Sequence, residues 1–385
     1  MTSSLPARAS IPPSPADSRP SRRRLARLTI ATVVAVTGLG WPFPAGVAPA
    51  DTARPAPPAA IAPGGAAATP DEVEPPRDRP PRSVPPARPL APAPPPDGRD
   101  APDPFILADK DRYLLFSTQV GFHNVPVATS PDLRQWSPPS DALPQLPDWS
   151  AWGRTWAPGV TQLDGRHLLY FTAHHQRSGR QCIGVATSTT ADGPYTPTAA
   201  SDPLVCQTHL GGSIDPHPYI DPHGTPFLLW KADGNAIGQP STLFAQALRP
   251  DGLALTGQPV ALLRSGAAWE QPLIENPALI PAGGSYVLLY SGGWWESAGY
   301  AIGYATCDTP LGPCTKATVD RPLLAGADDQ AGPGGACPIT GPAGDQWLAY
   351  HSWTPGAIGY GHDGGARSLR FASLTWRDGQ PAVTP

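Results

Sequence analysis

Apolar and polar residues alternate along most of the chain from about residue 101 onward, between short turns rich in proline, glycine and aspartate. The stretch SIDPHPYIDPHGTPFLLWK, from Ser213 to Lys231, shows this pattern clearly, with the turn Asp-Pro-His-Gly between two apolar segments. Such a stretch predicts a strand, a tight turn and a second strand. Because no convincing helical periodicity accompanies it, we expect an all-β fold.

One unit of this kind recurs: a polar residue beside a proline, a turn with glycine or aspartate, and an aromatic-rich strand. The copies begin near residues 103, 156, 215, 275 and 333, so they lie 53, 59, 60 and 58 residues apart. A repeat of this length with several strands per unit is typical of a propeller blade. We therefore predict a five-bladed β-propeller over residues 101–385. A two-sheet sandwich is the alternative, which the regular repeat disfavours.

The first hundred residues have a different character. Three arginines, Arg22 to Arg24, precede an apolar run over residues 25–40, and Ala48-Pro49-Ala50 offers small residues for cleavage. This arrangement predicts a secretory signal peptide over residues 1–50 and a secreted, extracellular protein, with a retained single-span anchor as the alternative. Residues 51–100 consist mostly of Pro, Ala, Arg and Asp, so we expect a disordered proline-rich linker.

Charge and cysteine content narrow the possible partners. The formal net charge of -4 provides no basic field for nucleic acid. Export makes disulfides plausible, and the preferred pairing of the five cysteines is local, Cys182 with Cys206 and Cys307 with Cys314. Cys337 is then left over, although the sequence alone does not exclude a different pairing. We expect a monomer with no membrane contact after signal cleavage.

Three of the five units begin with a carboxylate: Asp103, Asp215 and Glu275. The first strand of every blade lines the central channel of a propeller, so these three acids are expected to converge. Three acids in one concave site fit glycoside hydrolysis: one protonates the leaving oxygen, a second activates water or attacks the sugar, and the third tunes and orients the acid. Glu270 is the rival acid, and Glu296 is a weaker candidate in an expected loop.

The short motifs APDPFIL, TWAPGV, SIDPHPYID, IENPALI, SYVLLYSGG, GPGGACP, LAYHSW and ARSLRFASLTW follow one another over residues 101–385. In their order and spacing they resemble glycoside hydrolase family 43, whose five-bladed propeller enzymes act on arabinosyl and xylosyl linkages. The resemblance implies that Asp103 is the general base, Asp215 the pKa-modulating and orienting carboxylate, and Glu275 the general acid of an inverting reaction. It also implies that Arg367 reaches the sugar.

Two further expectations concern the channel and its walls. His351 matches a histidine near a bound cation or water in arabinanase-like members, so a structural calcium or other cation in the channel is expected there; a hydrogen-bonded core histidine is the alternative. No cofactor is expected for the chemistry itself. Trp156 and Trp294 are the preferred tryptophans for stacking on sugar rings. The motif Glu-Asn-Pro stands where many relatives have Glu-Gly-Pro.

Together these features predict a secreted inverting glycoside hydrolase that cleaves α-L-arabinofuranosyl or β-D-xylosyl linkages of plant cell-wall hemicellulose or arabinan. A non-catalytic carbohydrate-binding propeller and a β-xylosidase remain as alternatives. A retaining fructosidase on the same fold is disfavoured, because APDPFIL lacks the nucleophile motif that such an enzyme needs.

Overall fold

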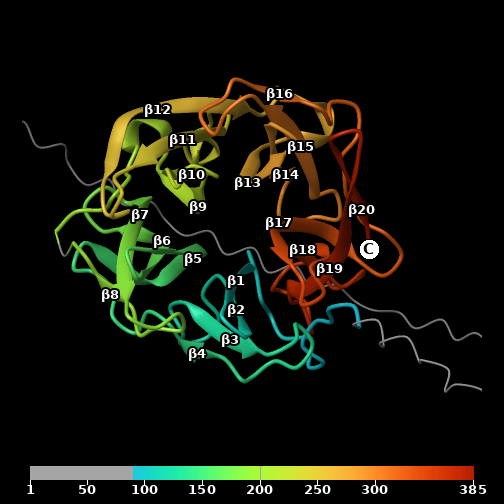
Figure 1. The fold of residues 1–385 in the computed structure, drawn as a ribbon, viewed down its shortest axis with the longest axis horizontal. Helices are drawn as coiled ribbons and strands as arrows, with labels where there is room; N and C mark the ends of the chain where they lie inside the picture. The colour runs from blue at the N-terminus through green and yellow to red at the C-terminus, as the bar shows by residue number, and fades with distance from the viewer. Residues whose placement is uncertain (1–89, 200) are drawn as a thin grey trace, which may run out of the picture. The chain divides into compact units, whose positions relative to one another are not determined.

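The computed structural model describes residues 90–199 and 201–385, and within them it has five four-stranded antiparallel sheets around a central axis (Figure 1). The predicted five-bladed propeller is thus confirmed. The predicted signal peptide and residues 51–89 of the predicted linker lie outside the described residues. Every blade is built from consecutive strands, so no strand is exchanged between the first and last blades of the described ring.

Blades 1 and 2 form the first part of the ring. Blade 1 comprises β1 (Phe105–Asp109), β2 (Arg112–Phe116), β3 (Pro126–Ser130) and β4 (Ser140–Asp141). Blade 2 comprises β5 (Ser150–Leu163), β6 (Arg166–His175), β7 (Arg180–Ser188) and β8 (Thr196–Pro197).

Blades 3 to 5 complete it, with three short 3-10 helices in the connections, η1 (Thr208–Leu210), η2 (Gly234–Ile237) and η3 (Ala268–Glu270). Blade 3 comprises β9 (Ser213–Ile220), β10 (Pro226–Ala232), β11 (Thr242–Leu248) and β12 (Leu255–Arg264). Blade 4 comprises β13 (Ile274–Ala282), β14 (Ser285–Gly292), β15 (Ala301–Cys307) and β16 (Cys314–Lys316). Blade 5 comprises β17 (Ala331–Thr340), β18 (Gln346–Trp353), β19 (Ser368–Arg377) and β20 (Gln380–Thr384).

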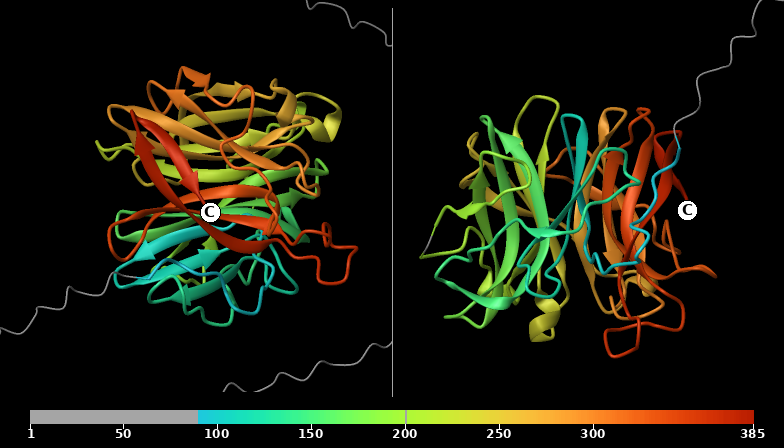
Figure 2. Two further views of the ribbon diagram at one scale, coloured as in Figure 1. Left: turned by 90° about the vertical axis from the view of Figure 1, so that its right-hand side faces the viewer. Right: turned by 90° about the horizontal axis from the view of Figure 1, so that it is seen from below.

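The strands run across the thickness of the ring, so the loops gather on its two faces (Figure 2). The first strand of each blade lies innermost, and these strands contact one another around the axis (Figure 1). The second strand of each blade carries a fully buried aromatic residue at the equivalent position, which fills the space between sheets: Phe116, Phe171, Trp230, Tyr290 and Tyr350. These are the aromatic-rich strands of the sequence repeat, and their burial supplies much of the hydrophobic stabilisation.

One equivalent residue in every blade, in or just before the innermost strand, has a left-handed backbone and marks a bend. The φ angles are 51° at Asp103, 40° at Ala157, 57° at Asp215, 49° at Asn276 and 65° at Gly335. Outside glycine, aspartate and asparagine tolerate this region best, whereas most residues are strained there. The bend disturbs the strand register, as between Glu275 and Ala278, and lets the side chains near it face the axis.

The backbone N–H of this left-handed residue usually joins its blade to the preceding one. It donates to a side chain just after the buried aromatic residue of the neighbouring second strand. The four such hydrogen bonds are Asp103 N to His351 Nδ1 at 2.9 Å, Ala157 N to Thr118 Oγ1 at 2.8 Å, Asp215 N to Thr172 Oγ1 at 3.1 Å and Gly335 N to Ser291 Oγ at 2.9 Å. The junction of blades 3 and 4 differs, because the residue after the buried aromatic Trp230 is Lys231, whose ammonium group cannot accept a hydrogen bond. The N–H of Asn276 instead donates to Asp215 Oδ2 at 2.9 Å.

The ring is closed by contacts between the first and last blades. Ala101 N donates to the Arg367 carbonyl at 3.0 Å, and Ile106 N donates to Cys337 Sγ at 3.3 Å. Just before them in the chain, Ala93 is hydrogen bonded to blade 1, its N–H donating to the Leu133 carbonyl at 3.0 Å. The prediction of a disordered linker over residues 51–100 is therefore wrong for its last part, because residues 93–100 are hydrogen bonded to blades 1 and 5.

Both predicted disulfides are present, Cys182–Cys206 and Cys307–Cys314, and Cys337 is free and buried. The second bridge joins facing residues of β15 and β16. Among the described residues, no helix has the length and apolar character needed to cross a membrane.

The hydrogen bonds between blades lead to a prediction about stability. Replacing Ser291 by alanine removes the acceptor of the buried Gly335 N–H, which should cost about 1–3 kcal/mol of unfolding free energy. Equilibrium urea denaturation measures this loss, and Ser140→Ala, at an exposed position, is the control. An unfolding midpoint equal to that of the wild type would contradict a role for this hydrogen bond in holding the blades together.

Candidate functional site

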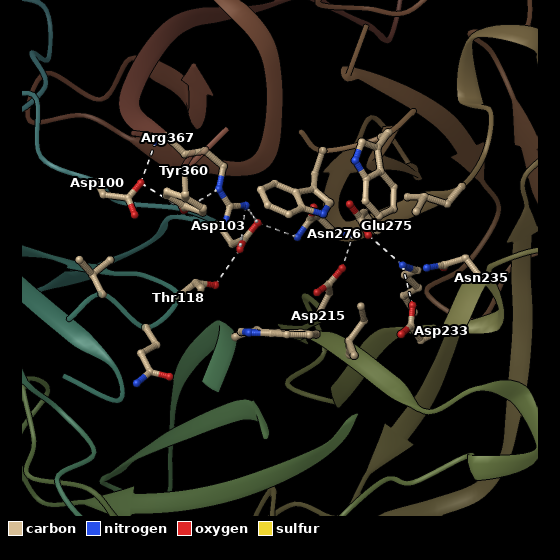
Figure 3. Close-up of a pocket in the computed structure, with 18 of the residues that line it drawn as sticks. Asp100, Asp103, Thr118, Asp215, Asp233, Asn235, Glu275, Asn276, Tyr360 and Arg367 are labelled. Atoms are coloured by element: carbon tan, nitrogen blue, oxygen red, sulfur yellow. Dashed lines mark hydrogen bonds and ion pairs between the residues drawn. The ribbon is translucent and has the colours of Figure 1, made fainter. Parts of the chain in front are cut away.

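A cavity of about 560 Å³ opens on one face of the ring at its axis. Its wall includes all six residues predicted for catalysis or substrate binding: Asp103, Trp156, Asp215, Glu275, Trp294 and Arg367. The carboxyl groups of Asp103, Asp215 and Glu275, which come from three different blades, gather around the cavity (Figure 3). A second, much smaller space of about 30 Å³ is lined by Asp103, Asp215, Asn276 and the residues that follow them.

Asp103 lies just before β1 and is surrounded by donors. Its Oδ2 accepts from Thr118 Oγ1 at 2.7 Å, Arg367 Nη1 lies 3.4 Å from both carboxylate oxygens, and Asn276 Nδ2 lies 3.5 Å from Oδ1. Burial alone would raise the pKa of Asp103, but the Arg367 charge and these hydrogen bonds hold it below the usual range. Asp103 is therefore ionised and can accept a proton.

Asp215, near the start of β9, has the opposite electrostatic setting. Burial first, and then the charge of Glu275, raises the pKa of Asp215 well above its usual range, although Lys231 acts in the other direction. Its Oδ2 accepts the Asn276 N–H, as described above. Asp215 therefore holds a proton more readily than Asp103 does.

Glu275, the second residue of β13, is held at both oxygens. Lys231 Nζ donates to Oε2 at 2.8 Å, and the Tyr300 hydroxyl lies 2.8 Å from Oε1. The Tyr300 hydroxyl also lies 2.8 Å from Asn276 Oδ1. Because these contacts fix the carboxyl plane, Glu275 presents a defined edge to the cavity.

Lys231 was missed by the sequence analysis. Its side chain is 1% exposed and also contacts Asp233 Oδ1 at 3.0 Å. Burial would lower the pKa of Lys231, but the carboxylates of Glu275 and Asp233 raise it above its usual value. The signal was present in the sequence, since a lysine within the apolar strand PFLLWKA needs a buried counter-charge.

Tyr300, Thr118 and Asn276 were also not assigned from the sequence. Thr118 and Tyr300 lie in connections between strands, and no local pattern indicates that their side chains face the axis. Asn276 was noted only as a departure from the family motif. It contacts Asp103 and Asp215 directly, and it contacts Tyr300, which in turn contacts Glu275.

Arg367 is fixed by an aromatic cluster at the rim. Its guanidinium carbon lies 4.8 Å from the Trp295 ring centroid, 5.8 Å from Tyr360 and 6.0 Å from Trp353. Its backbone N–H donates to Asp100 Oδ1 at 2.7 Å, and its Nε donates to the Tyr360 hydroxyl at 3.2 Å. Cation–π contact and these hydrogen bonds hold the guanidinium beside Asp103.

The two predicted stacking residues lie on opposite parts of the wall. Trp156, in β5 of blade 2, is partly buried, and Trp294, in the connection after β14, is 45% exposed. Both line the cavity, together with Trp295 and Tyr360. Aromatic faces are therefore available on more than one side of the carboxyl groups.

His351 lies behind the cavity wall and is fully buried. Its Nδ1 accepts the Asp103 N–H, so the ring proton is on Nε2, which has no partner among the described residues. Burial, helped by the Arg367 charge, lowers the pKa of His351 to about 3, so its 3.7 Å approach to the Asp103 carboxylate is not an ion pair. Neither nitrogen offers a free lone pair in this arrangement, and the residues around it do not fit a directly bound cation. The proposed reaction therefore uses no cation bound to His351.

The rival acids have other surroundings. Glu270 is fully buried away from the cavity, where it accepts from Lys316 Nζ at 2.5 Å, the Tyr290 hydroxyl at 2.8 Å and two backbone N–H groups. Glu296 is exposed in the connection after β14. Neither lines the cavity.

Comparisons with known proteins agree with this geometry. The family model described as glycosyl hydrolases family 43 matches residues 98–381. The chain is 27% identical over 238 residues to the β-D-galactofuranosidase xynD of Aspergillus niger, covering 58% of this chain and 64% of that protein. It is 28% identical over 247 residues to an extracellular endo-α-(1→5)-L-arabinanase of Thermotoga petrophila, covering 55% of this chain and 50% of that protein. The chain thus spans about half to two thirds of these curated relatives.

A solved structure is also similar over nearly its whole length. The endo-1,4-β-xylanase of Bacteroides thetaiotaomicron superimposes with a TM-score of 0.64 and 26% identity, covering 74% of this chain and 95% of that one. The uncovered part of this chain corresponds in size to its N-terminal region.

The buried charges of the site lead to a second prediction. Lys231→Met keeps the length of the side chain but leaves the carboxylates of Glu275 and Asp233 without their counter-charge. The expected loss is about 3–5 kcal/mol of unfolding free energy, because breaking a buried pair strands its partners. Urea denaturation at neutral pH measures it, with Arg166→Met at an exposed position as the control. A loss as small as that of the control would show that the carboxylates do not need Lys231.

Proposed function

Because the chain belongs to family 43 of the glycosyl hydrolases, we propose that it hydrolyses glycosidic bonds by a single displacement with inversion at the anomeric carbon. One observation carries this proposal: carboxyl groups with opposed electrostatic settings face one cavity. Asp103 is kept ionised, whereas burial and the charge of Glu275 raise the pKa of Asp215 well above its usual range. A pair of carboxyls whose environments separate their proton affinities is what an acid–base hydrolase requires.

The roles follow from these surroundings. Asp103 takes a proton from the attacking water, and Arg367 and Thr118 keep it ionised and oriented. Glu275 gives its proton to the leaving oxygen. Asp215 is the carboxyl proposed to modulate and orient the acid, and it fixes the position of Asn276 by accepting the backbone N–H of that residue. No part of this scheme requires a cofactor.

The substrate that the cavity favours is a neutral pentose polymer. The charged residues on the wall are five acids and two bases, so an anionic sugar would be repelled: Asp100, Asp103, Asp215, Asp233, Glu275, Lys231 and Arg367. One of the relatives is named as an endo-α-(1→5)-L-arabinanase, which favours α-L-arabinofuranosyl linkages. The similar xylanase keeps β-D-xylosyl linkages as the second candidate. The predicted signal peptide supports secretion, and outside the cell the enzyme would have access to plant polysaccharide.

The direct test uses the full chain after export. It should be incubated with linear arabinan, arabinoxylan and xylobiose, with sizing of the products and proton NMR of the first-formed anomer. We expect arabinose or arabino-oligosaccharides of inverted configuration. A retained anomer would overturn the single displacement, and binding of all three glycans without any cleavage would favour the alternative of a non-catalytic sugar-binding propeller.

Glu275→Gln tests the proposed acid. With an unactivated substrate kcat should fall about 10²–10⁴-fold, because protonation of the leaving oxygen is lost. An aryl glycoside with a 2,4-dinitrophenyl leaving group should lose much less, since that group departs without a proton. The melting temperature should also decrease, because Lys231 loses one of its two carboxylates, so rates are compared well below it.

Glu296→Gln, at an exposed position in the same region of the chain, is the matched control. Equal losses for good and poor leaving groups would exclude Glu275 as the acid and point to a role in binding.

A further inference from the structure

The hydroxyl of Tyr300 has two acceptors but only one hydrogen. It lies 2.8 Å from Glu275 Oε1 and 2.8 Å from Asn276 Oδ1. A phenol can donate to one of them only, and must accept from the other or contact it without a hydrogen. Which arrangement is present depends on where the proton of Glu275 is.

The orientation of the Asn276 amide is set by its other neighbour. Its Nδ2 points to Asp103 Oδ1 at 3.5 Å, and an ionised carboxylate only accepts. The amide oxygen therefore faces Tyr300 and needs a donor there. Rotating the amide would place its oxygen against the Asp103 carboxylate, which electrostatics disfavours.

The other oxygen of Glu275 is committed as well. Lys231 Nζ lies 2.8 Å from Oε2 and can only donate, so a proton on Glu275 resides on Oε1. In that state Oε1–H donates to the Tyr300 oxygen, and the Tyr300 hydrogen goes to Asn276 Oδ1, so every donor has an acceptor. In the ionised state Tyr300 donates to Oε1, and Asn276 Oδ1 faces a phenol oxygen with no hydrogen between them.

From these contacts we propose that Tyr300 and Asn276 are positioning residues that form a hydroxyl switch for Glu275: the Tyr300 hydrogen points to Asn276 while Glu275 holds its proton, and to Glu275 Oε1 after that proton has left. The inference rests on the proposed acid role of Glu275. During the reaction the Glu275 O–H bond breaks and its proton bonds to the leaving oxygen, which keeps the electron pair of the cleaved C–O bond. The Tyr300 hydrogen rotates from Asn276 to Oε1, and Tyr300 never gives up its own proton.

The tyrosine is suited to rotation of its hydroxyl alone. Its side chain is 1% exposed, and its ring stacks on His351 with centroids 6.1 Å apart and planes 11° apart. Burial first, and then the nearby carboxylates, raises the pKa of Tyr300 well above its usual value. The phenol therefore remains protonated throughout the working pH range.

The other groups that face Glu275 set the background on which the switch acts. These groups are Lys231, which also pairs with Asp233, and the carboxyls of Asp215 and, farther away, Asp103. The switch adds a short-range preference to this balance. A glycine at position 276, as in the commoner motif, would leave Tyr300 free to donate to Glu275 in its ionised form.

A double-mutant cycle tests this inference. The pH dependence of kcat/KM would be measured with 4-nitrophenyl α-L-arabinofuranoside, or the β-D-xyloside if the glycan panel favours xylose. In Asn276→Gly the alkaline limb should move about one pH unit lower, since Tyr300 then donates to the Glu275 carboxylate without losing another partner. Glycine also accepts the left-handed backbone at this position, so the fold is retained.

In the Tyr300→Phe background the same substitution should leave the alkaline limb unmoved, because no hydroxyl remains to change partners. A change of the acid limb in both backgrounds would report only the lost contact between Asn276 and Asp103. The switch is overturned if Asn276→Gly leaves the alkaline limb in place, or if it moves that limb equally in both backgrounds. Failure of the proposed function is distinct, since the wild type would then cleave none of the glycans.

Discussion

The hydrogen bond from the Asn276 backbone to Asp215 is the point at which the ring and its chemistry depend on each other. At the other four junctions the N–H of the left-handed residue goes to a threonine, serine or histidine of the preceding blade. At this junction Lys231 stands in the acceptor's place, and a carboxyl of the site takes the N–H. The exception frees a buried ammonium to face Glu275, while it fixes Asp215 beside the same residue.

The presence of Lys231 at this junction explains how the buried carboxyls of Asp215 and Glu275 can coexist with a buried lysine. Each charged group in the cavity would be costly alone, but Lys231 lies between Glu275 and Asp233, and Arg367 lies beside Asp103. Asp215 has no cation in direct contact, and burial together with Glu275 therefore favours its neutral form. The two cations thus pair with Asp103, Glu275 and Asp233, and the pKa values of Asp103 and Asp215 are moved in opposite directions.

The sequence was sufficient for the fold because the repeat is dictated by packing. The buried aromatic residues of the second strands recur at nearly constant intervals, and the turns between strands have clear chemical signatures. The convergence of Asp103, Asp215 and Glu275 also followed from the position of each near the start of an innermost strand. Both disulfides were predictable because each joins cysteines close in sequence.

The sequence repeat places the three acids at equivalent positions, but in the structure their positions differ. Asn276, not Glu275, occupies the left-handed position that Asp103 and Asp215 occupy in their blades. Glu275 precedes that position by one residue, where an unperturbed strand would turn it to the opposite face. The bend of β13 places it on the cavity wall nevertheless. Such an offset depends on backbone conformation, and no period in the sequence encodes it.

The residues that were missed share a physical reason for being missed. Lys231, Thr118 and Tyr300 belong to second strands or connections, and their partners are more than a dozen residues away in the chain. Thr118 contacts Asp103 within blade 1 and Tyr300 contacts Glu275 within blade 4, whereas Lys231 contacts Glu275 across the junction of blades 3 and 4. Each contact depends on how separate strands and connections pack, which no local pattern records. The departure from Glu-Gly-Pro to Glu-Asn-Pro shows why such residues matter. One added amide joins the surroundings of the proposed acid to those of the proposed base, so a change at position 276 affects both.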